Sequence, residues 1–260
     1  MQQLVDEFQM QGFVVLNNAF SKDEISTLNR AVDSYLERFP FTSSEWVKGG
    51  SSSYQAGNVL PKTADFDLAI ESPVPLGFAR ACLGEEVTFE HLSIVVRNSE
   101  PNPTEPKGWH RDNTRDYGRR KEIGAISMIY YLTDVSETDH CFSIVPETHN
   151  RLVDLRPEEV RPGDEIDITG PAGTAVVFHA RCLHSGKVKP NSRQRRTLHV
   201  YYWKVGKPRT STTSAIPPRL YQKGGPKLAP KLYSKWNIDE VLDTIGRKNE
   251  LSQPKTPPSY

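Results

Sequence analysis

Residues 109–113 read Trp-His-Arg-Asp-Asn, and the His-x-Asp within them is the feature on which the predicted fold and function depend. Alternate side chains of an extended backbone point to the same face, so His110 and Asp112 can present a nitrogen and an oxygen to one metal ion. A second histidine from a distant strand would complete two histidines and one carboxylate, a ligand set typical of non-haem Fe(II) oxygenases. His184, towards which a strand predicted over residues 173–178 runs, is the candidate for that position.

Arg195 supports this interpretation, because His-x-Asp alone is common by chance. It lies eleven residues after His184, directly before Thr197–Trp203, which is predicted to be the last core strand. A guanidinium can bind a carboxylate through two parallel hydrogen bonds. Arg195 could therefore hold a dicarboxylic cosubstrate such as 2-oxoglutarate.

The order His110-x-Asp112, His184, Arg195 resembles the phytanoyl-CoA dioxygenase family of Fe(II)/2-oxoglutarate oxygenases. Further similar segments are FQMQGFVVL at 8–16, FSKDEI at 20–25, YYLTD at 130–134 and CFSIVPETH at 141–149. The resemblance covers about residue 4 to about residue 203, and its spacing selects Arg195 from the basic cluster Arg193, Arg195 and Arg196. One turn departs from the pattern, because residues 146–149 read Pro-Glu-Thr-His where the family usually has Gly-x-His or Gly-Ser-His.

The resemblance implies a mainly β fold with flanking helices, a double-stranded β-helix (a cupin-like jelly roll) with iron at its open end. It also implies that His110, Asp112 and His184 hold Fe(II), that Arg195 pairs with the far carboxylate of 2-oxoglutarate, and that O2 takes the remaining position on the metal. The expected reaction oxidises a C–H bond of a small metabolite or natural-product intermediate and releases succinate and CO2. Hydroxylation is the expected outcome, with desaturation, epoxidation and ring formation also open.

Two alternatives lack oxygenase activity. The first is a jelly-roll binding module with a structural metal, but structural zinc has four protein ligands, often thiolates, whereas the candidates here number three and no cysteine is directly adjacent to any of them. The second is a cupin-type metal-dependent hydrolase or isomerase, which has no need of Arg195.

Local patterns predict the elements around this centre. Apolar residues at helical spacing before Gly12 predict a first helix, and Ser21 and Glu24 predict a capping box that opens a second. Residues 66–84 are predicted to be helical with a break at Pro73, and a last helix is expected at 238–247. We expect a single domain over residues 1–250 and a frayed tail at 251–260.

Residues 42–64 are irregular and rich in glycine and serine, yet they contain Trp46 and Tyr54. Flexible linkers seldom contain tryptophan, so this segment is predicted to be a mobile active-site loop over the iron.

The candidates for contact with the substrate are drawn from loops and from the strand of Arg195. They are Trp46, Tyr54, Arg97, Arg111, Asn113, Arg115 and His199. His199 follows Arg195 by four residues and so shares its face, although a core histidine with satisfied hydrogen bonds is the alternative. His91, His140 and His149 fall in turns or at strand edges and are interpreted as surface residues.

Composition limits the other classes of function. The 260 residues carry a formal net charge of +1, which indicates neither nucleic acid nor a membrane as a partner. Three cysteines, Cys82, Cys141 and Cys182, form no CxxC pair, so no disulfide framework is expected. The N-terminus lacks the pattern of a signal peptide, and a cytoplasmic location is expected.

Overall fold

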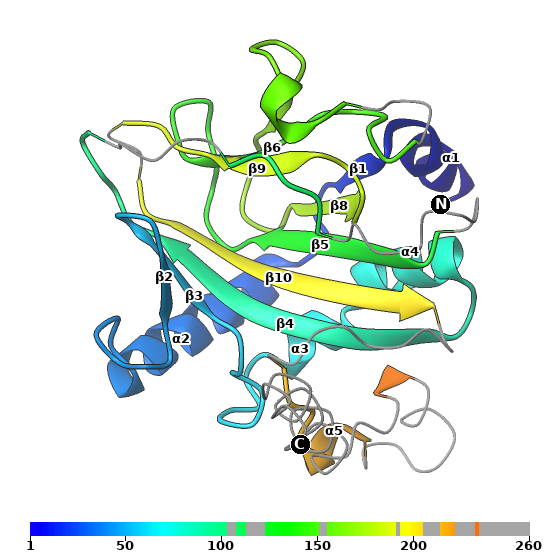
Figure 1. Ribbon diagram of the computed structural model, residues 1–260. Helices are drawn as coiled ribbons and strands as arrows, with labels where there is room; N and C mark the ends of the chain where they lie inside the picture. The colour runs from blue at the N-terminus through cyan, green and yellow to red at the C-terminus, as the bar shows by residue number, and fades with distance from the viewer. Residues whose placement is uncertain are drawn as a thin grey trace, which may run out of the picture.

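Two sheets form the framework of the molecule in the computed structural model, which describes residues 1–102, 108–112, 123–150, 155–190, 193–204, 214–221 and 232–233. The larger sheet has the strand order β1-β8-β5-β10-β4-β3-β2, and the smaller one has the order β7-β6-β9. In Figure 1, β6 and β9 lie over β5 and β10. Every strand pair within either sheet is antiparallel.

The strands of the larger sheet include two long central ones. They are β1 (Phe13–Leu16), β2 (Val47–Gly49), β3 (Ser53–Ala56), β4 (Val87–Arg97), β5 (Ala125–Tyr131), β8 (Ala175–His179) and β10 (Arg195–Lys204). The smaller sheet consists of β6 (Cys141–Ile144), β7 (Ile166–Ile168) and β9 (His184–Lys187). This is the expected double-stranded β-helix, so the predicted fold class is confirmed.

The helices are α1 (Gln2–Gln11), α2 (Lys22–Arg38), α3 (Asp67–Glu71), α4 (Pro73–Leu83) and α5 (Pro218–Tyr221), with a 3-10 turn at Pro157–Glu159. The capping box of α2 is present, since Glu24 N–H donates to Ser21 Oγ and Ser21 N–H donates to Glu24 Oε2. Gly12 ends α1 with a positive φ of 81°, and its N–H donates to Phe8 O. Both signals in the sequence are therefore confirmed.

Two apolar cores lie on the two faces of the larger sheet. The larger core joins that sheet to α1–α4 and includes Phe8, Leu28, Phe78 and Ile94. The smaller core fills the space between the two sheets, with Ile129 and Phe178 from one sheet and Phe142 and Ile168 from the other. The face of the larger sheet that looks toward the smaller sheet is called the site face below.

The structure adds detail that the sequence patterns did not predict. Residues 87–97 form one long strand, β4, with an irregularity opposite Tyr201 and Tyr202. Part of the segment 42–64 is a hairpin of β2 and β3 that extends the larger sheet beside β4. The helix expected at 238–247 and the tail at 251–260 lie outside the described residues. Within the described ranges, no helix has the length and apolar character needed to cross a membrane.

Candidate metal centre

His110 and His184 are joined through their backbones. The N–H of His110 donates to His184 O at 3.1 Å, and the N–H of His184 donates to His110 O at 3.0 Å. This antiparallel bridge adds the 110–112 segment to the edge of the smaller sheet beside β9. Because the pairing fixes both backbones, the two imidazoles lie close together, with ring centroids 4.3 Å apart.

Asp112 completes a group of three possible metal ligands. The Oδ1 atom of Asp112 is 3.2 Å from His184 Nε2 and 3.7 Å from His110 Nε2. The three ligand atoms all lie within 4.8 Å of one another. The His184 side chain is 6 % exposed and that of His110 is 56 % exposed, so the group has a buried side and an open side.

Both histidines are oriented by backbone carbonyls. Nδ1 of His110 donates to Gly108 O at 3.0 Å, and Nδ1 of His184 donates to Cys182 O at 2.9 Å. A carbonyl oxygen can only accept, so each bond places the ring proton on Nδ1 and leaves the Nε2 lone pair for a metal. Hydrogen bonds of this kind accompany most metal-binding histidines.

The carboxylate of Asp112 is oriented by the larger sheet. Ser127, on β5, donates from its hydroxyl to Asp112 Oδ2 at 3.0 Å, and the Tyr201 hydroxyl, on β10, also hydrogen-bonds this carboxylate. Burial alone would raise the pKa of Asp112, but the two histidines and the Ser127 hydrogen bond outweigh it and hold the pKa below its usual value. Asp112 is thus an anion ready to bind a cation, and neither Ser127 nor Tyr201 was predicted from the sequence.

Arg195 lies on the site face of β10 and has a buried guanidinium. The residue is 8 % exposed, and its Nε and Nη1 atoms have no hydrogen-bond partner among the described residues. Burial, followed by the nearby charge of Arg97, lowers the pKa of Arg195. Buried donors without partners are costly, so this position fits an anionic ligand such as the far carboxylate of 2-oxoglutarate.

The neighbouring arginines differ from Arg195 in having acidic partners. Arg193 is mostly exposed and binds Asp139 at 2.7 Å, while Arg196 binds Asp33 at 2.7 Å from the opposite face of β10. Arg193 and Arg196 are thus engaged in ion pairs, which agrees with the choice of Arg195 as the residue that binds the cosubstrate.

Trp46 and Tyr54 lie on the helix side of the larger sheet. Trp46 is buried in the larger core, where its indole donates to Phe39 O at 2.8 Å, and Tyr54 stacks on Phe41. The structure does not bring either aromatic to the three ligands. Alternation along β3 instead places Ser53 and Gln55 on the site face, and Gln55 donates to Ser93 Oγ at 3.1 Å.

Arg111 points away from the metal-binding side chains that flank it. Its guanidinium donates to the carbonyl oxygens of Arg181 at 2.8 Å and Leu155 at 3.0 Å, so it ties together backbone segments. Arg97 and His199 do lie on the site face. In the register of β4 and β10, Arg97 is directly opposite Arg195. Asn113 and Arg115 lie outside the described residues.

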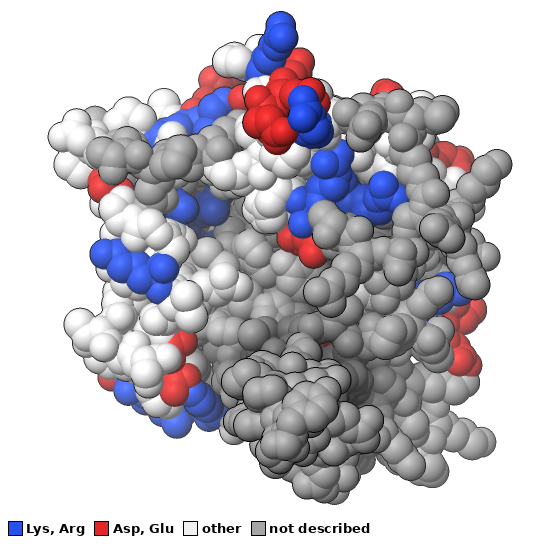
Figure 2. Space-filling view, in the orientation of Figure 1, with Lys and Arg blue, Asp and Glu red and all other residues white. Residues whose placement is uncertain are grey.

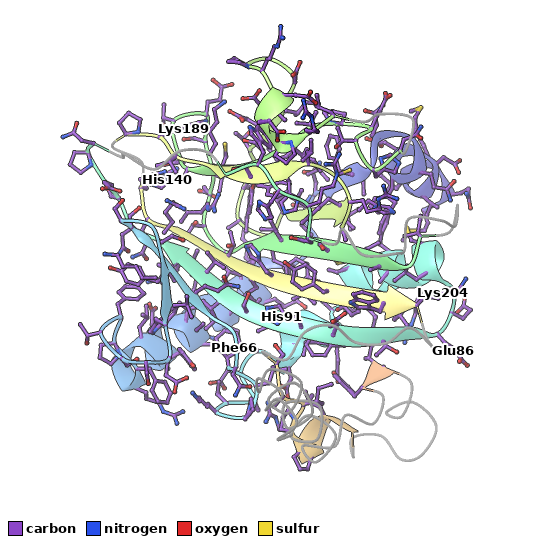
Figure 3. The ribbon with its side chains drawn as sticks, viewed as in Figure 1. Phe66, Glu86, His91, His140, Lys189 and Lys204 are labelled. Carbon is purple, nitrogen blue, oxygen red and sulfur yellow. The ribbon has the colours of Figure 1, made fainter. Side chains whose placement is uncertain are left out.

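Two histidines interpreted as surface residues are buried, which corrects that prediction. His91 is 6 % exposed and contacts Ser214 Oγ through Nδ1 at 2.8 Å. His140 is fully buried, contacts Asn98 O, and accepts from Lys189 N–H at 3.0 Å. Figure 3 shows His140 close to Lys189 and His91 beside the central strands. Both positions depend on strand pairing, which sequence position alone does not reveal.

Comparison with known proteins identifies the family. Residues 8–197 match the family model described as phytanoyl-CoA dioxygenase. The chain belongs to the phytanoyl-CoA dioxygenase family. It is an enzyme of the Fe(II)/2-oxoglutarate-dependent oxygenase class, and Fe(II) and 2-oxoglutarate are its metal and cosubstrate.

Proteins to which this chain is similar catalyse different reactions. An L-proline trans-4-hydroxylase from Streptomyces griseoviridis is 24 % identical over 223 residues, which cover 71 % of this chain and 79 % of that protein. The alpha ketoglutarate dependent epimerase SnoN of nogalamycin biosynthesis has a TM-score of 0.63 at 18 % identity, covering 78 % of this chain and 80 % of SnoN. HygX from Streptomyces hygroscopicus, with nickel, 2-oxoglutarate and hygromycin B bound, has a TM-score of 0.62 at 16 % identity, covering 79 % and 88 % of the two chains.

Charged side chains of both signs lie on the surface that the structure describes (Figure 2). In Figure 2, basic and acidic side chains lie next to each other on the described part of the face that is shown. This agrees with the net charge of +1.

Proposed function

We propose that this enzyme hydroxylates a C–H bond of a small metabolite or natural-product intermediate, with conversion of 2-oxoglutarate and O2 to succinate and CO2. The observation that carries the proposal is the combination of three clustered ligand atoms with a buried guanidinium that has no described partner. The first can hold Fe(II), and the second can bind the far end of a dicarboxylate.

The residues of the chain are assigned as follows. His110, Asp112 and His184 bind the metal through Nε2, Oδ1 and Nε2, and Arg195 binds the carboxylate of the cosubstrate that lies furthest from the metal. Ser127 and Tyr201 hold Asp112 so that Oδ1 faces the two imidazoles. When bound, Fe(II) and 2-oxoglutarate supply with O2 the oxidising power for attack on a C–H bond.

The more open side of the cluster is the place proposed for the substrate. His110 is more exposed than His184, which leaves that side accessible to a small molecule. Among the earlier candidates, Arg97 and His199 lie on the site face. The segment 42–64 is still proposed as an active-site loop, now with Ser53 and Gln55 as its residues on that face.

The alternatives without oxygenase activity are a metal-binding module and a cupin-type hydrolase or isomerase. Arg195 argues against both, because neither needs a buried guanidinium on the site face that has no partner among the described residues. We also propose a cytoplasmic location and no nucleic-acid or membrane partner, in keeping with three free cysteines and mixed surface charge.

Succinate formation tests the proposal. The purified enzyme should be supplied with Fe(II), 2-oxoglutarate and O2, with and without panels of amino acids and glycosides. Succinate should form faster with a true substrate, and that substrate should gain one oxygen atom by mass spectrometry. His184→Ala should abolish both signals, whereas Arg193→Ala should retain them. A product of unchanged oxygen content would indicate epimerisation or ring closure instead, and a complete lack of succinate would contradict the proposal.

A further inference from the structure

The strand that contains Arg195 holds a second side chain with a buried nitrogen that lacks a partner in the described part of the chain. His199 lies four residues further along β10, and its Nε2 atom is buried without a hydrogen-bond partner among the described residues. Alternation places Arg195 and His199 on the same face of the strand. Three buried nitrogens for which the described residues offer no partner therefore occur along one face of one strand: Nε and Nη1 of Arg195 and Nε2 of His199.

Along β10, His199 lies between Arg195 and Tyr201. Two residues beyond it, Tyr201 hydrogen-bonds Asp112, and the same tyrosine pairs with Ser127 on β5. At about 3.3 Å per residue, His199 lies about 13 Å along the strand from Arg195. A ligand that extends from Arg195 toward Asp112 must therefore pass His199.

The electrostatic surroundings of His199 support the same placement. Burial is the largest influence on its pKa, followed by the charge of Arg195, and together they lower the pKa to about 3 despite the opposing effect of Asp112. His199 is thus neutral over the working pH range. A neutral imidazole beside Arg195 can donate a hydrogen bond to an anion without adding a second buried positive charge.

We propose that His199 is a positioning residue for the cosubstrate, donating a hydrogen bond from Nε2 to 2-oxoglutarate between Arg195 and the metal ligands. This inference rests on the proposed function, and it assigns His199 to the cosubstrate rather than to the substrate. It also explains the unsatisfied nitrogen, because bound 2-oxoglutarate would provide the missing acceptor.

Three substitutions at this position separate the hydrogen bond from packing. The side-chain amide of His199→Gln can donate from a position close to that of the imidazole Nε2. The shorter amide of His199→Asn cannot reach that position, and His199→Phe keeps a ring but removes both nitrogens. His149→Asn is the matched control, because His149 also has a buried ring nitrogen without a described partner but lies beside α1, where it contacts Gln9 O.

The readout is binding of 2-oxoglutarate to Ni(II)-loaded protein, measured by calorimetry so that no turnover is needed. His199→Asn and His199→Phe should raise the Kd for 2-oxoglutarate about tenfold to a hundredfold, as expected for loss of a hydrogen bond to a charged group. His199→Gln should restore most of the affinity. The Ni(II) affinity of all variants, and 2-oxoglutarate binding by His149→Asn, should stay within about twofold of the wild type, a limit below the effect of one hydrogen bond.

Two results would overturn the inference while the proposed function stands. One is a wild-type Kd for 2-oxoglutarate in His199→Phe, and the other is equal weakening in the Gln, Asn and Phe variants, which would indicate packing alone. If the Ni(II)-loaded wild type does not bind 2-oxoglutarate, the proposed function itself fails.

Discussion

The hydroxyl of Ser127 donates to Oδ2 of Asp112 at 3.0 Å, while the other oxygen of the same carboxylate lies 3.2 Å from Nε2 of His184. One oxygen is thus committed to the larger sheet and the other is directed at the metal-binding nitrogens. The serine hydroxyl fixes the rotation of the carboxylate before any metal arrives.

Ser127→Ala should therefore weaken metal binding without removing a ligand. Loss of a hydrogen bond that orients a metal ligand typically costs 10- to 100-fold in affinity or activity. The affinity for Mn(II) or Ni(II), measured by calorimetry, should fall within about that range. Ser136→Ala is the control, because Ser136 makes a similar bond to Asp139 at 2.6 Å in the turn before β6. Equal metal affinity in the two variants would contradict the orienting function of Ser127.

Arg195→Ala should reduce the affinity for 2-oxoglutarate by at least about a hundredfold and leave the metal content near normal. Removing one partner of a buried charge pair costs about 3–5 kcal/mol, whereas an exposed pair contributes about 0–1 kcal/mol. Arg193→Ala, which breaks the pair between the mostly exposed Arg193 and the buried Asp139, should change the 2-oxoglutarate affinity little. Titration of Ni(II)-loaded variants with 2-oxoglutarate measures both effects. If Arg193→Ala weakened 2-oxoglutarate binding more than Arg195→Ala, the assignment of Arg195 to the cosubstrate would be wrong.

His179 should make the folded state sensitive to acid. Burial, together with the charges of His149 and Arg181, lowers its pKa from 6.5 to about 4. Between pH 4 and pH 6.5 the unfolded chain binds more protons than the folded one. The part of the free energy of unfolding that depends on neutral His179 is therefore complete above pH 6.5 and is lost as the pH falls toward 4. From pH 7 to pH 5 the loss should be about 2 kcal/mol of the free energy of unfolding.

His179→Asn should remove this part of the pH dependence. The asparagine carbonyl can still accept the Arg181 N–H that His179 Nδ1 accepts at 3.1 Å, but it does not titrate. Urea unfolding at pH 7 and pH 5 should show a smaller difference for the variant, by about 2 kcal/mol. The same difference in both proteins would show that His179 is not the source.

Two glycine substitutions should change stability in opposite directions. A Cβ on Gly12 would lie 2.4 Å from Cys182 Sγ and 2.4 Å from His149 Nδ1, at a φ of 81°. Left-handed backbone alone costs about 1–2 kcal/mol, so Gly12→Ala should destabilise the protein by more than about 2 kcal/mol. A Cβ on Gly77, within α4, meets no atom within 4 Å, so Gly77→Ala should stabilise it by about 0.5–1 kcal/mol.

Thermal unfolding measures both changes, with roughly 2–4 °C expected per kcal/mol for a protein of this size. A midpoint for Gly12→Ala equal to that of the wild type would contradict the close packing of the α1 terminus against Cys182 and His149.

The sequence by itself determined the features that depend on local spacing. The capping box of α2 and the left-handed Gly12 involve contacts within a few residues, so their residue types identified them. Alternation along an extended strand placed His110 and Asp112 on one face, with Arg111 turned away to bind backbone carbonyls. The spacing of His184 and Arg195, read through the family resemblance, selected the remaining positions.

The tertiary structure decided which residues surround these positions, because strand register is a long-range property. The backbone bridge between His110 and His184 brings together residues from distant parts of the chain, and the pairing of β5 with β10 brings Ser127 and Tyr201 to Asp112. Register also placed Tyr54 on the helix side of the larger sheet, where Trp46 is buried as well, and His91 and His140 are buried by the packing of the strands. A shift of one residue in a strand exchanges its two faces, and no local pattern in this sequence fixes that choice.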